Sequence, residues 1–238
     1  MRAALSFAPL GLDASTPVGL WGYSGGANAT AWAAALQKSY APELSLTAIA
    51  TGGTPADGIG IARKVDEDPV TNAGFFSLVL SAIAGTNRSY PGLITPILNA
   101  KGLAALASQK DGCGGGTSDG SPEPTGRLAD YTTVADPLSA PNVKPILPLI
   151  TLPMAGSTPV SDVFVYHSIV DELIPVEGAD RMVAAWCQDG AHVSYFRGVA
   201  GEHVAFQATT SPLVLAYLSS RLLGAPATVL PPGTTVCN

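Results

Sequence analysis

Apolar and small residues in the first part of the chain follow two periods, one typical of strands and one typical of a helix. Residues 17–22 and 44–51 are short, largely apolar runs of the kind that form buried strands. Between them, alanines and other small residues recur at helical spacing from about residue 25 to residue 40. Strand, helix and strand in this order are typical of a parallel sheet. The pattern therefore predicts a βαβ unit, followed by a turn-rich loop over residues 51–57.

The same alternation returns near the C-terminus. Residues 162–168 (DVFVYHS) form a β-branched and aromatic run that is typical of a buried strand. A helix over about 176–189, a strand over 192–199 and a last helix over about 204–223 follow. Residues 224–238 are rich in proline and threonine, so we expect an extended coil there. Together with the N-terminal unit, this pattern predicts an α/β fold with a mainly parallel sheet.

The middle of the chain has a different character. Residues 70–84 and 90–107 show apolar helical spacing, and residues 111–126 form a loop of glycine, serine and proline. Residues 137–159 are proline-rich and irregular. The pattern is typical of a helical insertion rather than of sheet, although a separate small domain is the alternative. We therefore divide the chain into a first part of the core over residues 1–69, a helical cap with its connecting loops over 70–160, and a second part of the core over 161–238.

Composition and charge narrow the class of protein. Hydrophobic residues make up 47% of the 238 residues and charged residues 13%, which excludes a disordered chain. The net charge is −6 without a basic cluster, so nucleic acid and anionic membrane surfaces are poor partners. No apolar run is long enough to span a bilayer. The first 17 residues lack the pattern of a signal peptide and are not interpreted as one.

The three cysteines do not have the spacing of a zinc or redox motif. If the protein is exported, we favour a disulfide between Cys187 and Cys237, which would attach the C-terminal tail to the body. The odd count leaves one thiol without a partner in this chain, and Cys113 is then that thiol. Three reduced cysteines are the alternative.

A candidate nucleophile lies where the first strand meets the first helix. Residues 22–26 read Gly-Tyr-Ser-Gly-Gly, a Gly-x-Ser-x-Gly motif in a strand–turn–helix context. A serine at such a sharp bend exposes its hydroxyl above the sheet. We expect that glycine is required at Gly22 and Gly26, because a side chain two residues before or after the serine would collide with neighbouring backbone. The following helix directs its N-terminal amides at the site, and the N–H of Gly25 is the expected first oxyanion donor. Ser24 is therefore the predicted nucleophile, with a glycine-rich turn that has no catalytic role as the alternative.

A base and an acid in the expected chain order follow the later strands. Asp171 lies in the loop after strand 162–168, and His203 lies in the loop after strand 192–199. Loops at the carboxyl ends of parallel strands are where α/β enzymes collect catalytic groups. The order Ser, Asp, His is that of α/β-hydrolases. We therefore predict Ser24, Asp171 and His203 as a catalytic triad, without a metal or organic cofactor.

Other residues compete for the two supporting roles. Glu172 is next to Asp171 but would point elsewhere if Asp171 faces the site. His167 lies within a strand pattern and fits a buried core histidine, whereas His192 opens a strand with no acid placed to orient it. Asp57 is an alternative acid because some hydrolases place the acid after an earlier strand.

Four segments of the chain resemble the secretory lipase family, the lipase A-like α/β-hydrolases. The segments are GYSGGANATAWAAALQKSYAPEL, TGGTPAD, VYHSIVDELIPV and GEHVAF, and the resemblance covers nearly the whole chain. It implies an α/β-hydrolase fold in which Ser24 is the nucleophile, Asp171 the acid and His203 the base. It also implies that the insertion around residues 70–135 is a lid over an acyl tunnel. Apolar side chains of that insertion would suit an acyl chain or would be plain core: Phe75, Phe76, Leu78, Leu80 and Ile83.

The resemblance further implies function and location. It implies hydrolysis of carboxylic esters, most readily triacylglycerol, by a secreted enzyme that contacts a lipid interface transiently. Peptidase or acyltransferase chemistry at the same triad is a further alternative. The sequence does not set the chain-length preference or the oligomeric state.

One departure from the family concerns the N-terminal side. Family members carry a long portion before the nucleophile strand, and it supplies a signal peptide, early strands and the loop with a second oxyanion donor. Only residues 1–23 precede Ser24 here, and the usual partner of Cys113 would lie in the same portion. Loss of one oxyanion donor typically reduces the rate by a factor on the order of 10²–10³. We therefore expect a truncated form of the fold, and the alternative function is a catalytically silent fragment or remnant without a complete oxyanion hole.

Overall fold

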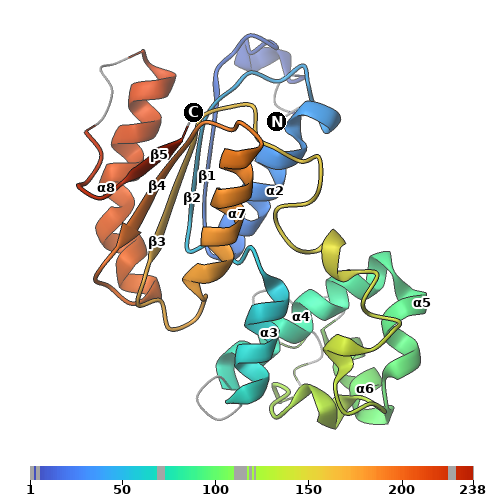
Figure 1. Cartoon of the computed structure of the whole chain (residues 1–238). Helices are drawn as coiled ribbons and strands as arrows, with labels where there is room; N and C mark the ends of the chain where they lie inside the picture. The colour runs from blue at the N-terminus through green and yellow to red at the C-terminus, as the bar shows by residue number, and fades with distance from the viewer. Residues whose placement is uncertain are drawn as a thin grey trace. The chain divides into compact units, whose positions relative to one another are not determined.

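The structure is a computed structural model that describes residues 3, 6–68, 73–109, 117, 120, 122–224 and 229–237 (Figure 1). The chain forms two compact units. Unit 1 consists of Met1–Ala56 and Leu152–Asn238, and unit 2 consists of Asp57–Thr151.

Unit 1 is built on a five-stranded sheet in the order β1-β2-β3-β4-β5. Strands β1 (Val18–Tyr23), β2 (Leu46–Gly52), β3 (Val163–Ser168) and β4 (Val193–Gly198) pair in parallel. Their carboxyl ends therefore meet at one edge of the sheet, where the predicted catalytic loops begin. The four predicted strands are confirmed, with ends that differ by one or two residues.

Helices cover both faces of this sheet (Figure 1). Helices α2 (Gly25–Tyr40) and α7 (Val176–Gln188) pack on one face, and α8 (His203–Leu222) packs on the other. Strand residues alternate between the two cores, as the period of two requires: Val163 and Val165 face α2 and α7, whereas Phe164 and Tyr166 face α8. Every residue of β3 is buried because both of its faces are covered.

The C-terminal tail differs from the predicted coil. Residues Thr235–Cys237 form strand β5, which pairs antiparallel with β4. Cys237 is bonded to Cys187 of α7, so the favoured disulfide is present and attaches the tail to this helix. The backbone pairing could not be read from a segment rich in proline and threonine. Cys113 lies outside the described residues.

Unit 2 is helical and contains α3 (Gly58–Glu67), α4 (Ala73–Ser89), α5 (Pro91–Ile94) and α6 (Ala100–Ser108). Phe76 is fully buried in it, and its ring centroid lies 5.3 Å from that of Tyr131. Short 3-10 helices complete the chain: η1 (Ala8–Leu10), η2 (Thr95–Ile97), η3 (Leu128–Tyr131), η4 (Pro137–Ser139) and η5 (Leu147–Leu149).

The limits of unit 2 differ from the predicted insertion over residues 70–160. Helix α3 was not predicted, and the structure assigns it to unit 2 rather than to the core. It buries Ile61, Ala62 and Val65 on one face, and this face needs the other helices of unit 2 as partners. At the other end, Leu152 already belongs to unit 1, because its N–H bonds the carbonyl of Ala56. Most of the predicted 111–126 loop lies outside the described residues.

The described part of the chain contains no helix that combines the length and the apolar character needed to cross a membrane.

Candidate active site

Ser24 lies on a strained bend between β1 and α2. Its φ of 54° and ψ of −123° make it the one residue other than glycine with a positive φ in the described part of the chain. Such a conformation costs roughly 1–3 kcal/mol and persists where neighbouring structure enforces it. Here the N–H of Ser24 donates to the carbonyl of Gly52 at 2.9 Å, and its own carbonyl accepts from Asn28 at 3.0 Å. The backbone of β2 and the first turn of α2 therefore hold the bend.

The two flanking glycines differ in what they allow. A Cβ on Gly22 would lie 2.1 Å from the carbonyl oxygen of Gly26 and 2.5 Å from Oγ1 of Thr30, so Gly22 permits the close approach of strand and helix. A Cβ on Gly26 would meet nothing within 4 Å. The expected collision is thus confirmed for Gly22 and wrong for Gly26, because the side chain of residue 26 would point into open space.

Helix α2 begins at Gly25, directly after Ser24. The first N–H groups of a helix have no partner within the helix, and the dipole adds partial positive charge at this end. The N–H of Gly25, at the first position of the helix, has no partner within the helix.

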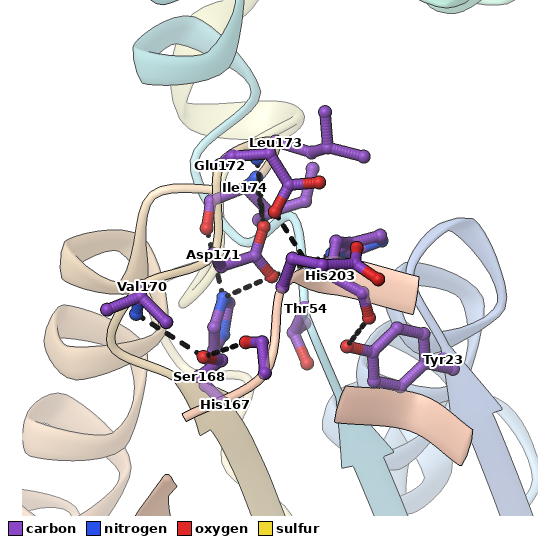
Figure 2. Close-up of polar contacts among 12 residues, drawn as sticks. Tyr23, Thr54, His167, Ser168, Val170, Asp171, Glu172, Leu173, Ile174 and His203 are labelled. Atoms are coloured by element: carbon purple, nitrogen blue, oxygen red, sulfur yellow. Dashed lines mark hydrogen bonds and ion pairs between the residues drawn. The ribbon is translucent and has the colours of Figure 1, made fainter. Parts of the chain in front are cut away.

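Asp171 and His203 meet at the carboxyl ends of β3 and β4 (Figure 2). Oδ2 of Asp171 lies 2.6 Å from Nδ1 of His203. Oδ1 accepts from the N–H groups of Leu173 at 3.0 Å and Ile174 at 2.7 Å, which fixes the carboxylate within its own turn. This orientation directs Oδ2 toward the imidazole of His203, where it accepts a hydrogen bond from Nδ1.

The environment keeps Asp171 ionised. Burial by itself would raise its pKa, but hydrogen bonds from His167, His203 and the N–H of Ile174 outweigh burial and hold the pKa well below its ordinary value. A charged carboxylate against Nδ1 favours the tautomer with its proton on Nδ1, which leaves Nε2 of His203 as the basic nitrogen.

The backbone of His203 is held on both sides. Its N–H donates to Oε2 of Glu172 at 2.9 Å, and its carbonyl accepts from the hydroxyl of Tyr23 at 2.6 Å. The rings of Tyr23 and His203 lie with centroids 5.0 Å apart. Glu202 caps α8 through the N–H groups of Val204 and Ala205. The sequence analysis expected the side chain of Glu172 to point elsewhere. In the structure it instead accepts a hydrogen bond from the backbone N–H of His203.

A serine links the acid loop to the histidine loop. Oγ of Ser168, the last residue of β3, donates to the carbonyl of Gly201 at 2.5 Å and accepts from the N–H of Val170 at 3.3 Å (Figure 2). A hydrogen bond thus joins the end of β3, after which the loop with Asp171 begins, to the loop that precedes His203.

Ser24 and His203 lie at the same edge of the sheet but are not hydrogen-bonded. Ser24 bonds Gly52, and a Cβ on the next residue, Gly53, would lie 3.0 Å from Cε1 of His203. Nε2 of His203 is buried and has no hydrogen-bond partner among the described residues. Catalytic hydrogen bonds are often long in structures without substrate. The structure therefore brings Asp171 and His203 together, whereas Ser24 makes no hydrogen bond with Nε2 of His203.

The competing residues have other environments. Asp57 caps α3 in unit 2, where it accepts from the N–H of Gly60 at 2.9 Å. His192 is exposed. His167 is fully buried, as expected for a core histidine, but its Nε2 also lies 3.4 Å from Oδ2 of Asp171. The sequence analysis did not predict this contact. The one feature of the sequence that points to it is the short separation of four residues between His167 and Asp171.

Among the described residues, no group of three or more histidine, cysteine, aspartate or glutamate side chains is arranged to hold a metal ion.

Comparison with known proteins identifies the family. The model of the secretory lipase family matches residues 1–229. The chain belongs to the secretory lipase family. Among its relatives, the secreted triacylglycerol lipase LIP5 of Malassezia globosa is 31% identical over 94% of this chain and 48% of its own length. The probable inactive lipase MT1628 of Mycobacterium tuberculosis is 33% identical over 96% of this chain and 50% of its own length. This member of the secretory lipase family thus spans about half the length of these relatives.

A solved structure gives the same fold. Lipase A of Candida antarctica in its closed state superposes with a TM-score of 0.80 at 26% identity, over 93% of this chain and 52% of that one. The predicted α/β-hydrolase fold with a mainly parallel sheet is therefore confirmed.

Proposed function

We propose that this secretory lipase family member hydrolyses carboxylic esters through an acyl-enzyme on Ser24. The observation that carries the proposal is the strained bend at Ser24, which lies at the same sheet edge as the buried pair of Asp171 and His203. A positive φ on a serine at a helix N-terminus has a cost in stability, and a nucleophile is the role that explains it.

The proposed reaction uses groups of this chain alone. Nε2 of His203 takes the proton of the Ser24 hydroxyl as its oxygen attacks the ester carbonyl. Asp171 stabilises the imidazolium that forms, and the N–H of Gly25 stabilises the oxyanion. His203 then protonates the departing alcohol. Water then gives a proton to the same nitrogen as its oxygen attacks the acyl carbon. The bond from that carbon to the Ser24 oxygen breaks, His203 returns the proton to Ser24, and the carboxylic acid leaves.

The proposed substrates are lipids with an apolar acyl chain, triacylglycerols first. Relatives are named triacylglycerol lipases, and unit 2 supports the proposal with an apolar cavity of about 70 Å³. Leu80 and Ile83 are among its lining residues, whereas Phe76 is packed in the core. We take unit 2 as the cap of the enzyme and this cavity as a place for part of an acyl chain.

We further propose that the protein acts outside the cell. Relatives are named secreted lipases, and the disulfide between Cys187 and Cys237 belongs in an oxidising compartment.

A catalytically silent role is the second candidate. Two observations favour it: one relative is named a probable inactive lipase, and Nε2 of His203 makes no hydrogen bond with Ser24. In that case the residues of the triad would be present without an activated nucleophile.

Covalent labelling and turnover together distinguish the two candidates. The purified chain is treated with a fluorophosphonate and assayed with a short and a long p-nitrophenyl ester, beside Ser24→Ala as the matched control. Labelling and hydrolysis that both disappear in Ser24→Ala are expected. Labelling without turnover would indicate an activated serine with an incomplete oxyanion hole. Folded protein that is neither labelled nor active would overturn the ester hydrolase and favour the silent candidate.

A further inference from the structure

A second histidine contacts the proposed catalytic acid from inside the sheet. His167 is on β3, and its side chain is completely buried. Its Nε2 lies 3.0 Å from the carbonyl oxygen of Ile174 and 3.4 Å from Oδ2 of Asp171 (Figure 2). Its Nδ1 is buried and has no hydrogen-bond partner among the described residues.

These contacts determine the tautomer of His167. A carbonyl oxygen only accepts, so Nε2 must carry the proton in order to bond Ile174. A second proton on Nδ1 would place an unpaired donor and a positive charge in the interior, which is costly. His167 is therefore a neutral donor, whose Nε2–H is shared between the carbonyl of Ile174 and Oδ2 of Asp171.

One carboxylate oxygen thus receives two imidazole donors. Oδ2 of Asp171 faces Nδ1 of His203 at 2.6 Å and Nε2 of His167 at 3.4 Å. Oδ1 is engaged separately by the N–H groups of Leu173 and Ile174. A second donor on Oδ2 disperses part of the charge that would otherwise act on His203 alone.

We propose that His167 is a positioning residue of the proposed ester hydrolysis, which acts through Asp171 to aim Oδ2 at His203 and to moderate the basicity of that histidine. The proposal rests on the triad mechanism above. It assigns a role to a residue that makes no contact with Ser24 or with substrate in that mechanism.

Other titratable groups lie around the pair, and the test must leave them unchanged. Glu172 bonds the backbone N–H of His203, Glu202 caps α8, and the hydroxyl of Tyr23 bonds the carbonyl of His203. On β4, the register partner of His167 is Arg197, whose side chain pairs with Asp180 of α7 at 3.2 Å. None of these groups is altered by a substitution at His167.

The test follows the pKa of His203 by nuclear magnetic resonance. The chain has three histidines, so labelled imidazoles give three sets of resonances, from which that of His203 can be followed. His167→Leu removes the donor, and the backbone N–H groups on Oδ1 still hold Asp171 in place. The full charge of Oδ2 then acts on the imidazolium, and we expect the pKa of His203 to rise by about half a unit to one unit. His167→Gln places an amide N–H where Nε2 was and should leave that pKa close to the wild-type value.

Kinetics provides the second readout. A rise of one unit in the pKa of His203 would shift the acid limb of the kcat/KM profile toward higher pH. At pH values below the His203 pKa of both the wild type and the variant, kcat/KM would fall about tenfold. His192→Gln, at the exposed histidine, is the matched control and should change neither readout.

The outcomes separate a positioning role from a purely structural one. An unchanged pKa of His203 in folded His167→Leu, or an equal shift in the Leu and Gln variants, would overturn the proposal. If His167→Leu does not fold, His167→Asn replaces it, because its shorter side chain does not reach the position of Nε2. In that comparison, a shift with Asn but not with Gln supports the proposal, and no difference overturns it. The titration needs no turnover, so an inactive wild-type protein would refute the proposed function while the role of His167 is still decided.

Discussion

At the scale of single residues, the bend at Ser24 depends on the absence of one carbon atom. A Cβ on Gly22 would lie 2.1 Å from the backbone of Gly26, and backbone atoms cannot move aside as a flexible side chain can. We expect Gly22→Ala to lower the free energy of unfolding by about 1–3 kcal/mol and to abolish fluorophosphonate labelling of Ser24. Thermal unfolding and labelling measure the two effects.

Gly26→Ala is the control for this substitution. Its Cβ would meet nothing within 4 Å, and alanine replaces glycine inside helix α2. We expect labelling to persist and stability to rise by roughly 0.5–1 kcal/mol. Equal losses of stability and labelling in both alanine variants would show that the close approach of β1 and α2 is not the reason why position 22 requires glycine.

The acid of the pair makes a separate prediction about pH. The pKa of Asp171 in the folded protein is well below its value in the unfolded chain, which is about 3.9. Its contribution to stability is therefore present in full above that value and is lost as the pH falls from there through the folded pKa. We expect Asp171→Asn to flatten the decline in stability on acidification and to lower kcat by a factor on the order of 10⁴.

Denaturant unfolding followed from pH 7 down to about pH 2 measures the first effect, because the contribution is lost mainly below the unfolded pKa. The exposed Glu123→Gln is the control and should keep the wild-type slope. An Asp171→Asn profile parallel to that of the wild type would contradict the assignment of the acid-sensitive contribution to this carboxylate.

The sequence predicted three residues of the proposed site but not the residues that surround them. The order of Ser24, Asp171 and His203 was visible because each follows a strand of a parallel sheet, and strand ends converge in any such fold. The supports of the pair were not visible. The contact of Glu172 with the backbone of His203 depends on how two loops approach each other, which no local pattern encodes.

At the scale of elements, the same limit explains why helix α3 and strand β5 were not predicted. Helix α3 has ten residues and follows a turn-rich loop directly, so its apolar face of three buried residues spans too few turns to be recognised as a separate helix. Strand β5 has three residues and forms only because β4 offers a free edge beside it. Helices α2, α7 and α8 were predicted almost to the residue because their apolar periods are long.

Strand β5 also makes an element-scale prediction. Its disulfide joins residues separated by 50 positions, and closing a loop of that length restricts the unfolded chain. The chain-entropy model gives about 4 kcal/mol for such a crosslink, within the usual range of about 2–5 kcal/mol. We expect the Cys187→Ser/Cys237→Ser double variant to be less stable by an amount in this range.

Reduction of the wild-type protein tests whether the crosslink itself is responsible. Dithiothreitol should lower its melting temperature toward that of the double variant and leave the melting temperature of the double variant unchanged. A further decrease in the reduced double variant would point to another thiol-dependent contribution instead.

At the scale of the whole molecule, the proposed function assigns different tasks to the two units. Unit 1 contains every residue of the proposed reaction, and its sheet draws on both ends of the chain. Unit 2 contains the apolar cavity of about 70 Å³. If unit 2 is the cap, its cavity should affect the choice of acyl chain without affecting the chemistry at Ser24.

A tryptophan in the cavity tests this division of tasks. Ile83 lines the cavity, so Ile83→Trp would fill it, whereas Leu103 of α6 is exposed and is not among the lining residues. Each methylene excluded from an apolar site costs about 0.8 kcal/mol, close to a factor of four in binding. We therefore expect Ile83→Trp to reduce kcat/KM for a long p-nitrophenyl ester by about tenfold or more, to leave a short ester unaffected, and to differ in this from Leu103→Trp. Equal losses on both esters would instead indicate that the substitution disturbs folding, and an unchanged ratio in a stable variant would mean that the acyl chain binds elsewhere in the molecule.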